Sequence, residues 1–175
     1  MLGDELIFIG THFSSFDERG SFSKLFGQSP GEKIEFEGNI IQVNYVKNKL
    51  AGTLRGLHYQ VGTFAESKII HCIHGSVWDV AVDVRPESPT YKQWTGNTLS
   101  ASNMNFMRIP RGFAHGYITL EDETELIYFS DNELSMEHEK GVIWDDVSIG
   151  IKWPIEPVLI SGKDQSWPTL MQSLV

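Results

Sequence analysis

The chain has 175 residues, of which 41% are hydrophobic and 21% are charged, and its formal net charge is −9 at pH 7. This length predicts a single domain, residues 1–175, while the acidic balance argues against a nucleic-acid partner because phosphate binding needs a basic surface. No apolar run approaches the roughly 20 residues that cross a bilayer, and the start MLGDELIFIG lacks the features of a signal peptide, so we expect a cytoplasmic protein without a membrane partner.

Short segments rich in Val, Ile, Phe, Tyr and Thr, separated by Gly and Pro, predict strands throughout the chain. In chain order they cover 5–10, 39–48, 53–60, 67–74, 77–84, 97–101, 105–110, 116–120 and 125–130, with turns at 17–20, 85–90 and 110–113. Helix is expected at most within the first forty residues and at 166–175. Many short strands without a long helical period indicate an all-β sandwich or barrel.

The segment TLRGLHYQ, residues 53–60, places a histidine within a strand-like run. Because strand side chains alternate between two faces, we expect Arg55 and Leu57 on one side and Gly56, His58 and Gln60 on the other. That arrangement predicts a titratable ring on a polar face opened by a glycine.

The segment VWDVAVDV shows the clearest alternation in the chain. One predicted face carries Trp78, Val80, Val82 and Val84, and the other carries Val77, Asp79, Ala81 and Asp83. The preceding run ends at Gly75, so we expect residues 68–84 to form a hairpin.

The lone cysteine, Cys72, lies in an apolar segment and is expected to be a buried, inert thiol.

Four ionisable residues are candidates for chemistry: His58, Lys68, His115 and Tyr128. Taken singly, each also fits an ordinary structural role, such as a hydrogen-bonded strand histidine or a strand-end lysine in solvent. His115 is expected in a turn, where functional residues concentrate. Together inside a barrel, these groups would be costly unless they served a ligand.

Several runs resemble one family in order along the chain, from about residue 6 to residue 170. They are DERGSF, QVNY, TLRGLHYQ, ESKIIHCIHGSVWDVAVDVRPESPTYKQW, LSASN, IPRGFAHGY, LIYFSDN, EHEKGVIWDDVSIGIKWP and ISGKDQSWP. They resemble the dTDP-4-dehydrorhamnose 3,5-epimerase family. The resemblance implies a cupin-type jelly roll with minor peripheral helices, a homodimer with swapped edge strands, and no metal or cofactor.

The resemblance also implies a substrate and a mechanism. The family inverts carbons 3 and 5 of a dTDP-4-keto-6-deoxyhexose through enolate intermediates, on the way to L-rhamnose. By this resemblance His58 matches the base, Asp164 matches the carboxylate that orients it, Lys68 stabilises the enolate, and Tyr128 returns a proton from the opposite face. A base and a nearby cation are the groups that proton removal next to a ketone requires.

Further residues match the family's substrate contacts. Arg19 and Arg55 match diphosphate contacts, and the planar guanidinium suits phosphate because it donates two parallel hydrogen bonds. The remaining matches are polar pocket residues, Gln42, Asn44, Gln60 and His115, and nucleotide-side contacts, Trp144 and Lys163. Trp144 equally fits a place in the core.

Two departures from the family leave the regiochemistry and the nucleotide open. Glu133 and Leu134 stand where family members carry an aromatic pair, and Lys24 replaces an acidic residue near the nucleotide end. An enzyme that inverts only carbon 3 or only carbon 5 of a related 4-keto sugar nucleotide is therefore an alternative.

Two alternatives come from other functional classes. A metal-dependent cupin commonly needs two histidines spaced one residue apart, whereas His58 is followed by Tyr and Gln, and His71 and His74 are predicted on opposite strand faces. A non-catalytic sugar-nucleotide binding protein is the other alternative, although it has no need of both His58 and Tyr128.

Overall fold

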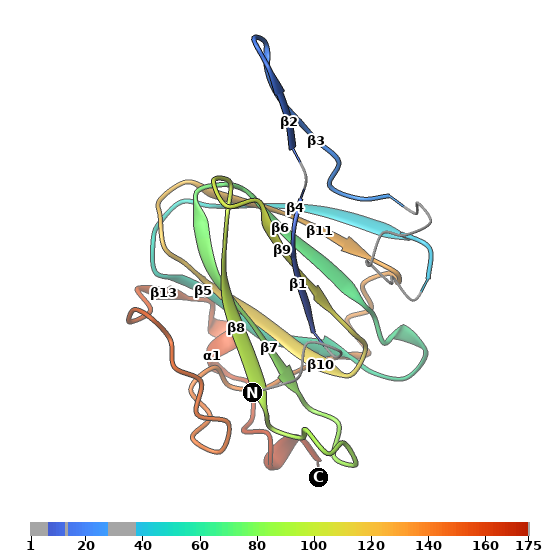
Figure 1. Ribbon diagram of the computed structural model, residues 1–175. Coiled ribbons are helices and arrows are strands. Elements are labelled where there is room, and N and C mark those ends of the chain that lie inside the picture. The colour runs from blue at the N-terminus through green and yellow to red at the C-terminus, as the bar shows by residue number, and fades with distance from the viewer. Residues whose placement is uncertain (1–6, 13, 28–37, 175) are drawn as a thin grey trace.

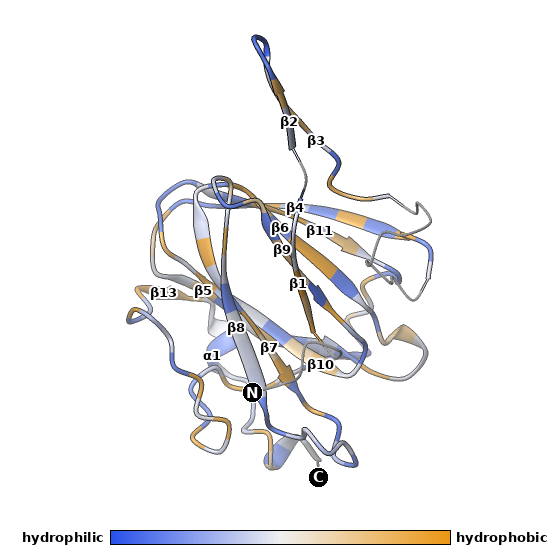
Figure 2. Cartoon of the chain, viewed as in Figure 1, coloured by the Kyte–Doolittle hydropathy of each residue, from blue (hydrophilic) through white to orange (hydrophobic). Residues whose placement is uncertain are grey.

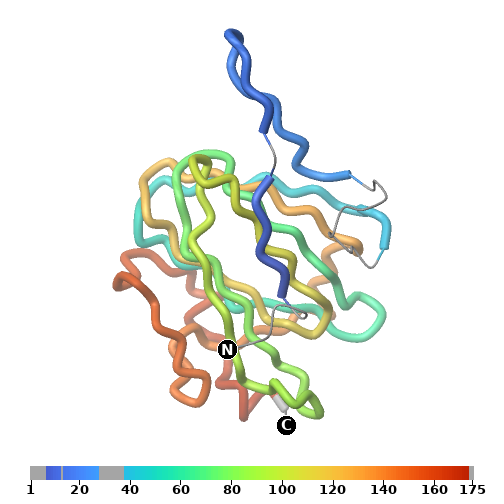
Figure 3. The backbone as a smooth tube through the Cα atoms, viewed as in Figure 1, coloured from blue at the N-terminus to red at the C-terminus, as the bar shows by residue number. Residues whose placement is uncertain are grey.

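The computed structural model describes residues 7–12, 14–27 and 38–174, which form two facing sheets and a projecting hairpin (Figures 1 and 3). The first sheet has the strand order β1-β9-β6-β11-β4, with β1 at Phe8–Thr11, β9 at Asn105–Ile109, β6 at Lys68–His74, β11 at Thr124–Ser130 and β4 at Gln42–Asn48. The second has the order β12-β5-β10-β7-β8, with β12 at Glu139–Gly141, β5 at Thr53–Gln60, β10 at Phe113–Thr119, β7 at Ser76–Asp83 and β8 at Trp94–Ser100; β13, Leu159–Ile160, pairs parallel to β5.

Between β4 and β11, each strand is followed along the chain by a strand of the other sheet, except that β7 and β8 both lie in the second sheet. β4 and β6 lie in the first sheet, whereas β5 and β7 lie in the second. The helical elements are short, namely η1 at Gly62–Phe64, α1 at Gly162–Gln165 and η2 at Gln172–Leu174. This confirms the predicted cupin-type jelly roll with minor peripheral helices.

The side chains of β7 divide between two hydrophobic clusters, as the alternation of residues 77–84 predicts. Val77 and Ala81 belong to the inner cluster, which both sheets enclose. Val80 and Val82 belong to the outer cluster, where residues 142–170 cover the second sheet. Figure 2 shows hydrophobic residues recurring along the strands of both sheets.

Cys72 lies in the inner cluster, 4% exposed, as expected of an inert thiol. Burial raises the pKa of its thiol to about 11, which keeps it protonated and unreactive.

Within the described residues, none of the helices has the length and apolar character needed to span a membrane.

The predicted hairpin over residues 68–84 is wrong. β6 pairs with β9 and β11 in the first sheet, while β7 pairs with β8 and β10 in the second. Gly75, with φ of +71°, turns the chain between the sheets, and a Cβ there would lie 2.5 Å from Thr124 Oγ1. A tight glycine turn therefore marks a sheet crossing here.

The expectation of helix near the N-terminus is also wrong for the described residues there. Residues 14–23 form an antiparallel hairpin, with β2 at Ser14–Asp17 and β3 at Gly20–Ser23. Residues 28–37 lie outside the described part of the chain. Figure 1 shows this hairpin extending away from the two sheets.

β5 has the predicted bounds, but its faces differ from simple alternation. His115 pairs with His58 and Tyr117 with Arg55, so β5 carries one extra residue at this point. Such a bulge shifts the alternation, and Leu57 packs in the outer cluster while Arg55 hydrogen-bonds Asn48 of β4. The prediction that Arg55 and Leu57 share a face is therefore wrong.

Gly56 makes the bulge possible. Its φ is +121°, and a Cβ on it would lie 2.6 Å from Gly116 Cα and 2.8 Å from the His115 carbonyl oxygen. Only glycine meets both demands, because other residues carry a Cβ and disfavour positive φ. The glycine in RGLH thus lets β5 and β10 approach closely beside His58.

Candidate active site

A cavity of about 300 Å³ opens between the two sheets, at the low end of the range for small-molecule sites. Six of the side chains that line it are predicted site residues: Gln42, Asn44, His58, Gln60, Lys68 and Tyr128. The other lining residues are Tyr45, Val46, Tyr59, Glu66, Ser130, Leu134 and Glu139. The cavity thus gathers a histidine, a lysine and a phenol, the side chains that the predicted chemistry uses.

The first sheet supplies one wall through the register of three strands. Ser130 of β11 lies opposite Lys68 of β6 on one side and Gln42 of β4 on the other. Two residues earlier on β11, Tyr128 lies opposite Asn44 of β4. Because strand residues two apart share a face, these side chains form two adjacent polar rows on the inner surface.

The second sheet supplies His58 from β5, facing the first sheet across the cavity. His58 Nε2 lies 2.6 Å from Asp164 Oδ1, and the His58 side chain is 28% exposed. Asp164 comes from α1, more than a hundred residues along the chain, and its amide is capped by Ser161 Oγ. The short helix α1 therefore positions the Asp164 carboxylate at Nε2 of the imidazole.

Asp164 is an ionised acceptor in this pair. Burial alone would raise its pKa, but the hydrogen bond and charge of His58, with the Gly56 amide and Ser161, outweigh burial and lower the pKa of Asp164. Since a carboxylate only accepts, His58 Nε2 carries the hydrogen and Nδ1 holds the free lone pair. This is the tautomer that a histidine base needs.

Tyr128 lines the cavity from the sheet opposite His58. Burial, followed by the neighbouring Tyr117 hydroxyl and the charge of Asp79, raises the pKa of Tyr128 well above its ordinary value. The phenol therefore keeps its proton at neutral pH, as a proton donor requires.

His115 lies in β10, so its expected place in a turn is wrong. It is 6% exposed, and its Nε2 lies 2.7 Å from Asp79 Oδ1, with Asp79 fully buried. The ring stands edge-on to Tyr128, with centroids 6.1 Å apart. The structure therefore places His115 behind Tyr128, away from the cavity lining. Sequence reasoning missed Asp79, whose signal was an acid on the apolar inner face of β7.

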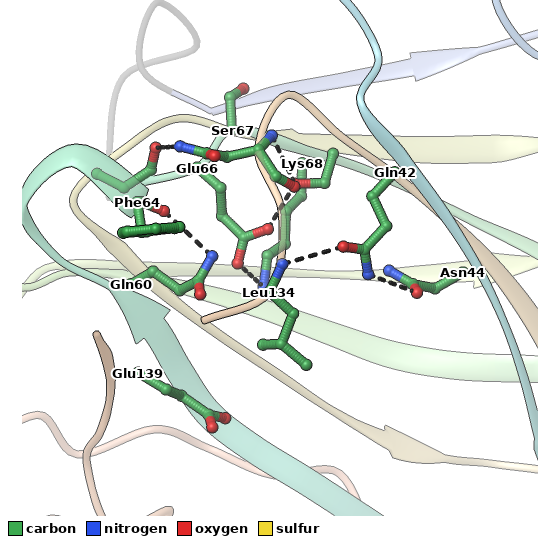
Figure 4. A network of polar contacts seen from close by, with 12 residues as sticks. Gln42, Asn44, Gln60, Phe64, Glu66, Ser67, Lys68, Leu134 and Glu139 are labelled. Atoms are coloured by element: carbon green, nitrogen blue, oxygen red, sulfur yellow. Dashed lines mark hydrogen bonds and ion pairs between the residues drawn. The ribbon is translucent and has the colours of Figure 1, made fainter. Parts of the chain in front are cut away.

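The predicted substrate-binding amides Gln60 and Gln42 form hydrogen bonds with other groups of the protein. Gln60 is 3% exposed, its Nε2 donates to the carbonyls of Phe64 and Glu133, and its Oε1 accepts from the Ser135 amide at 2.6 Å. Gln42 donates to Asn44 Oδ1 at 2.8 Å and accepts from the Leu134 amide at 3.0 Å (Figure 4). These amides hold the segment 133–135, so Leu134 forms part of the cavity wall.

The structure does not bring the remaining predicted residues into the cavity lining. Arg19 lies at the turn of the projecting hairpin, 86% exposed, and pairs with Asp17 at 2.6 Å. Arg55 donates to Asn48 Oδ1 at 2.9 Å, and Lys163 pairs with Glu139 at the cavity edge. Trp144 is half-buried, and its carbonyl accepts from Trp153 Nε1.

The described residues contain no group of three or more His, Cys, Asp or Glu side chains that could hold a metal ion. His58 and His115 each use Nε2 to contact an aspartate. His71 is buried and hydrogen-bonds His12, whereas His74 is exposed and bonds the Glu123 carbonyl, so the two point apart as their spacing predicts.

Comparisons with known proteins identify close relatives. The family model described as dTDP-4-dehydrorhamnose 3,5-epimerase matches residues 5–172. A protein of that name from Shigella flexneri is 45% identical over 166 residues, covering 92% of this chain and 88% of its own. A crystal structure of the Bacillus anthracis enzyme of that name, with TDP and PPi bound, is 36% identical, with a TM-score of 0.89 and 93% coverage of both chains.

A third comparison concerns a sugar complex. The structure of dTDP-6-deoxy-D-glucose-3,5-epimerase from Legionella pneumophila, in complex with dTDP-4-keto-L-rhamnose, is 34% identical to this chain. Its TM-score is 0.87, and the match covers 94% of this chain and 88% of that one. The cavity described above thus belongs to a fold that holds a dTDP-linked sugar in a relative.

Proposed function

This chain belongs to the dTDP-4-dehydrorhamnose 3,5-epimerase family, and from that membership we infer that it is an isomerase acting on a dTDP-linked 4-keto-6-deoxyhexose. The reaction is the inversion of carbons 3 and 5 of the sugar. Both carbons flank the 4-keto group, so removing the proton from either one produces an enolate. We propose that the product enters deoxysugar biosynthesis leading to L-rhamnose and cell-surface polysaccharide.

The proposed base is His58, acting through Nδ1. Support comes from the 2.6 Å contact between His58 Nε2 and Asp164, which leaves Nδ1 with the lone pair. As Nδ1 takes the proton, the ring becomes a cation, and the adjacent carboxylate stabilises that cation. Lys68, in the opposite wall, supplies the positive charge for the enolate oxygen.

The proposed acid is Tyr128. Inversion requires that a proton leave one face of the sugar ring and return to the other. One observation carries the proposal: His58 and Tyr128 line a single cavity from opposite sheets, with Asp164 bonded to the imidazole. A pyranose held between them exposes one face to each group.

Deuterium incorporation from heavy water tests the proposed reaction. With dTDP-4-keto-6-deoxyglucose as substrate, we expect solvent deuterium at both carbon 3 and carbon 5, and NMR will show both centres inverted. Label at only one of the two carbons would instead identify a single-carbon epimerase, consistent with Glu133 and Leu134 replacing the aromatic pair. No label at either carbon would refute the assignment.

We also propose a homodimer in which the β2–β3 hairpin of one protomer reaches the cavity of its partner. Within the described residues, Lys68 is the one Lys or Arg side chain that lines the cavity, so a diphosphate needs further cations. Arg19 lies at the tip of the hairpin, whose Phe16 and Phe22 are 80% and 74% exposed. Exposed aromatic residues beside an arginine are typical of an interface.

Light scattering is expected to give twice the 19.8 kDa mass of the chain. Arg19→Ala should leave the dimer and kcat nearly unchanged but raise KM by about tenfold, the loss expected when one charge-assisted contact to a phosphate is removed. Arg85→Ala, which removes an arginine paired with Asp83 outside the cavity lining, should leave KM at the wild-type value. A monomer, or an unchanged KM in Arg19→Ala, would contradict the proposal.

A single domain spanning residues 1–175 is part of the proposal, and the family match over residues 5–172 supports it. A cytoplasmic location stays a prediction from the composition of the chain.

A further inference from the structure

Glu66 is a carboxylate in the cavity wall that the reaction described above does not use. Its side chain is 9% exposed, and both of its oxygens accept from side chains. Lys68 Nζ lies 2.9 Å from Oε1, and Ser130 Oγ lies 2.5 Å from Oε2. Figure 4 shows the carboxylate directed at Lys68, with Gln60 beside it. With both oxygens occupied, Glu66 is placed to hold Lys68.

The backbone between Glu66 and Lys68 is fixed independently. The Ser67 amide donates to Asp131 Oδ1 at 2.7 Å, and the Ser67 carbonyl accepts from the Asp131 amide at 3.3 Å. The Asp131 side chain pairs with Arg111 at 2.9 Å and is fully shielded from solvent. Residues two apart on an extended segment project to one side, so Glu66 and Lys68 both face the cavity.

Ser130 links Glu66 to the neighbouring strand. Ser130 of β11 lies directly opposite Lys68 of β6, so the carboxylate bridges two paired strands. A lysine side chain is long and flexible, so an unrestrained ammonium samples many positions. In the described part of the chain, Glu66 is the one carboxylate that forms an ion pair with Lys68. The bridge therefore fixes where the ammonium lies.

We propose that Glu66 is a positioning residue that holds the Lys68 ammonium where the keto oxygen of the substrate will lie. This inference rests on the proposed function, because it takes Lys68 as the group that stabilises the enolate. Glu66 itself does not exchange protons with the sugar. Its effect on the reaction passes through the placement of Lys68, and misplacing a catalytic group by about 1 Å can cost on the order of 100-fold in rate.

Two substitutions separate placement from charge. Glu66→Ala should lower kcat by about 10- to 100-fold while KM changes by less than about threefold, because the diphosphate is bound elsewhere. Glu66→Gln should retain kcat within about fivefold, because its amide oxygen can still accept from Lys68. Its amide nitrogen can donate to Ser130 Oγ, whose hydrogen is free to turn to the Asn132 carbonyl 3.0 Å away.

The matched control is Glu123→Gln, which neutralises a glutamate paired with Lys47 at 2.7 Å on the surface. It should behave as wild type. Wild-type kcat in Glu66→Ala, or a loss in Glu66→Gln as large as in Glu66→Ala, would overturn the positioning role.

A second measurement needs no turnover. Labelling with an amine-reactive reagent, mapped by mass spectrometry, should modify Lys68 several-fold faster in Glu66→Ala than in wild type, with Glu66→Gln close to wild type. Ser130→Ala, which removes one anchor of the carboxylate, should give an intermediate rate and serves if Glu66→Ala does not fold. Wild-type Lys68 labelling in Glu66→Ala, or in Ser130→Ala where Glu66→Ala does not fold, overturns the inference. Absence of deuterium incorporation by the wild type would overturn the proposed function instead.

Discussion

Replacing His58 with alanine is expected to abolish deuterium incorporation and to lower kcat/KM by about 1,000-fold, within the range for losing a general base. In the proposed mechanism the imidazole removes the proton, because Asp164 occupies Nε2 and the His58 side chain lines the cavity. The measurement is the rate of label uptake at carbons 3 and 5 followed by NMR.

The matched control is His74→Ala. His74 is exposed, does not line the cavity, and bonds the Glu123 carbonyl through Nδ1 at 3.0 Å. This variant should keep wild-type label uptake. If His58→Ala retained uptake near that of His74→Ala, His58 would not be the base.

Replacing Tyr128 with phenylalanine is expected to separate proton removal from inversion. The aromatic ring stays and the hydroxyl is lost, so His58 can still remove and return protons on its own face. We expect label uptake within about tenfold of wild type, while formation of inverted product falls by about 100-fold, as for loss of a general acid.

Tyr91→Phe provides the control for removing a phenol hydroxyl. Tyr91 packs against the outer cluster, and its hydroxyl has no hydrogen-bond partner in the described structure. Inversion should be unchanged in this variant. Equal loss of label uptake and inversion in Tyr128→Phe would show that the phenol acts in proton removal rather than in reprotonation from the second face.

Local patterns in the sequence predicted strands well because strand alternation and turn residues are local properties. The alternation of residues 77–84 places Val80 in the outer cluster and Ala81 in the inner one, as expected. The sheet that a strand joins depends on partners distant in the sequence. The local pattern at Gly75 therefore predicts a hairpin, although the turn connects two sheets.

The residues of the candidate site were predictable mainly where they match a motif of the family. His58 and Asp164 are over a hundred residues apart, and no local pattern pairs them; the resemblance did so, and the structure places them 2.6 Å apart. Glu66 lies before the predicted strand, where an acidic residue usually faces solvent. Its place in the cavity follows from the Asp131 clamp on Ser67, which only the folded chain reveals.

The central claim is that one sugar ring lies between the His58 imidazole and the Tyr128 phenol. The most direct test is a crystal structure of the wild-type protein with a dTDP-linked 6-deoxyhexose that lacks the 4-keto group and therefore cannot react. We predict His58 Nδ1 at one face of the ring, beside carbons 3 and 5, and the Tyr128 hydroxyl at the other. A ring with both groups on the same face, or bound outside the cavity, would contradict this account.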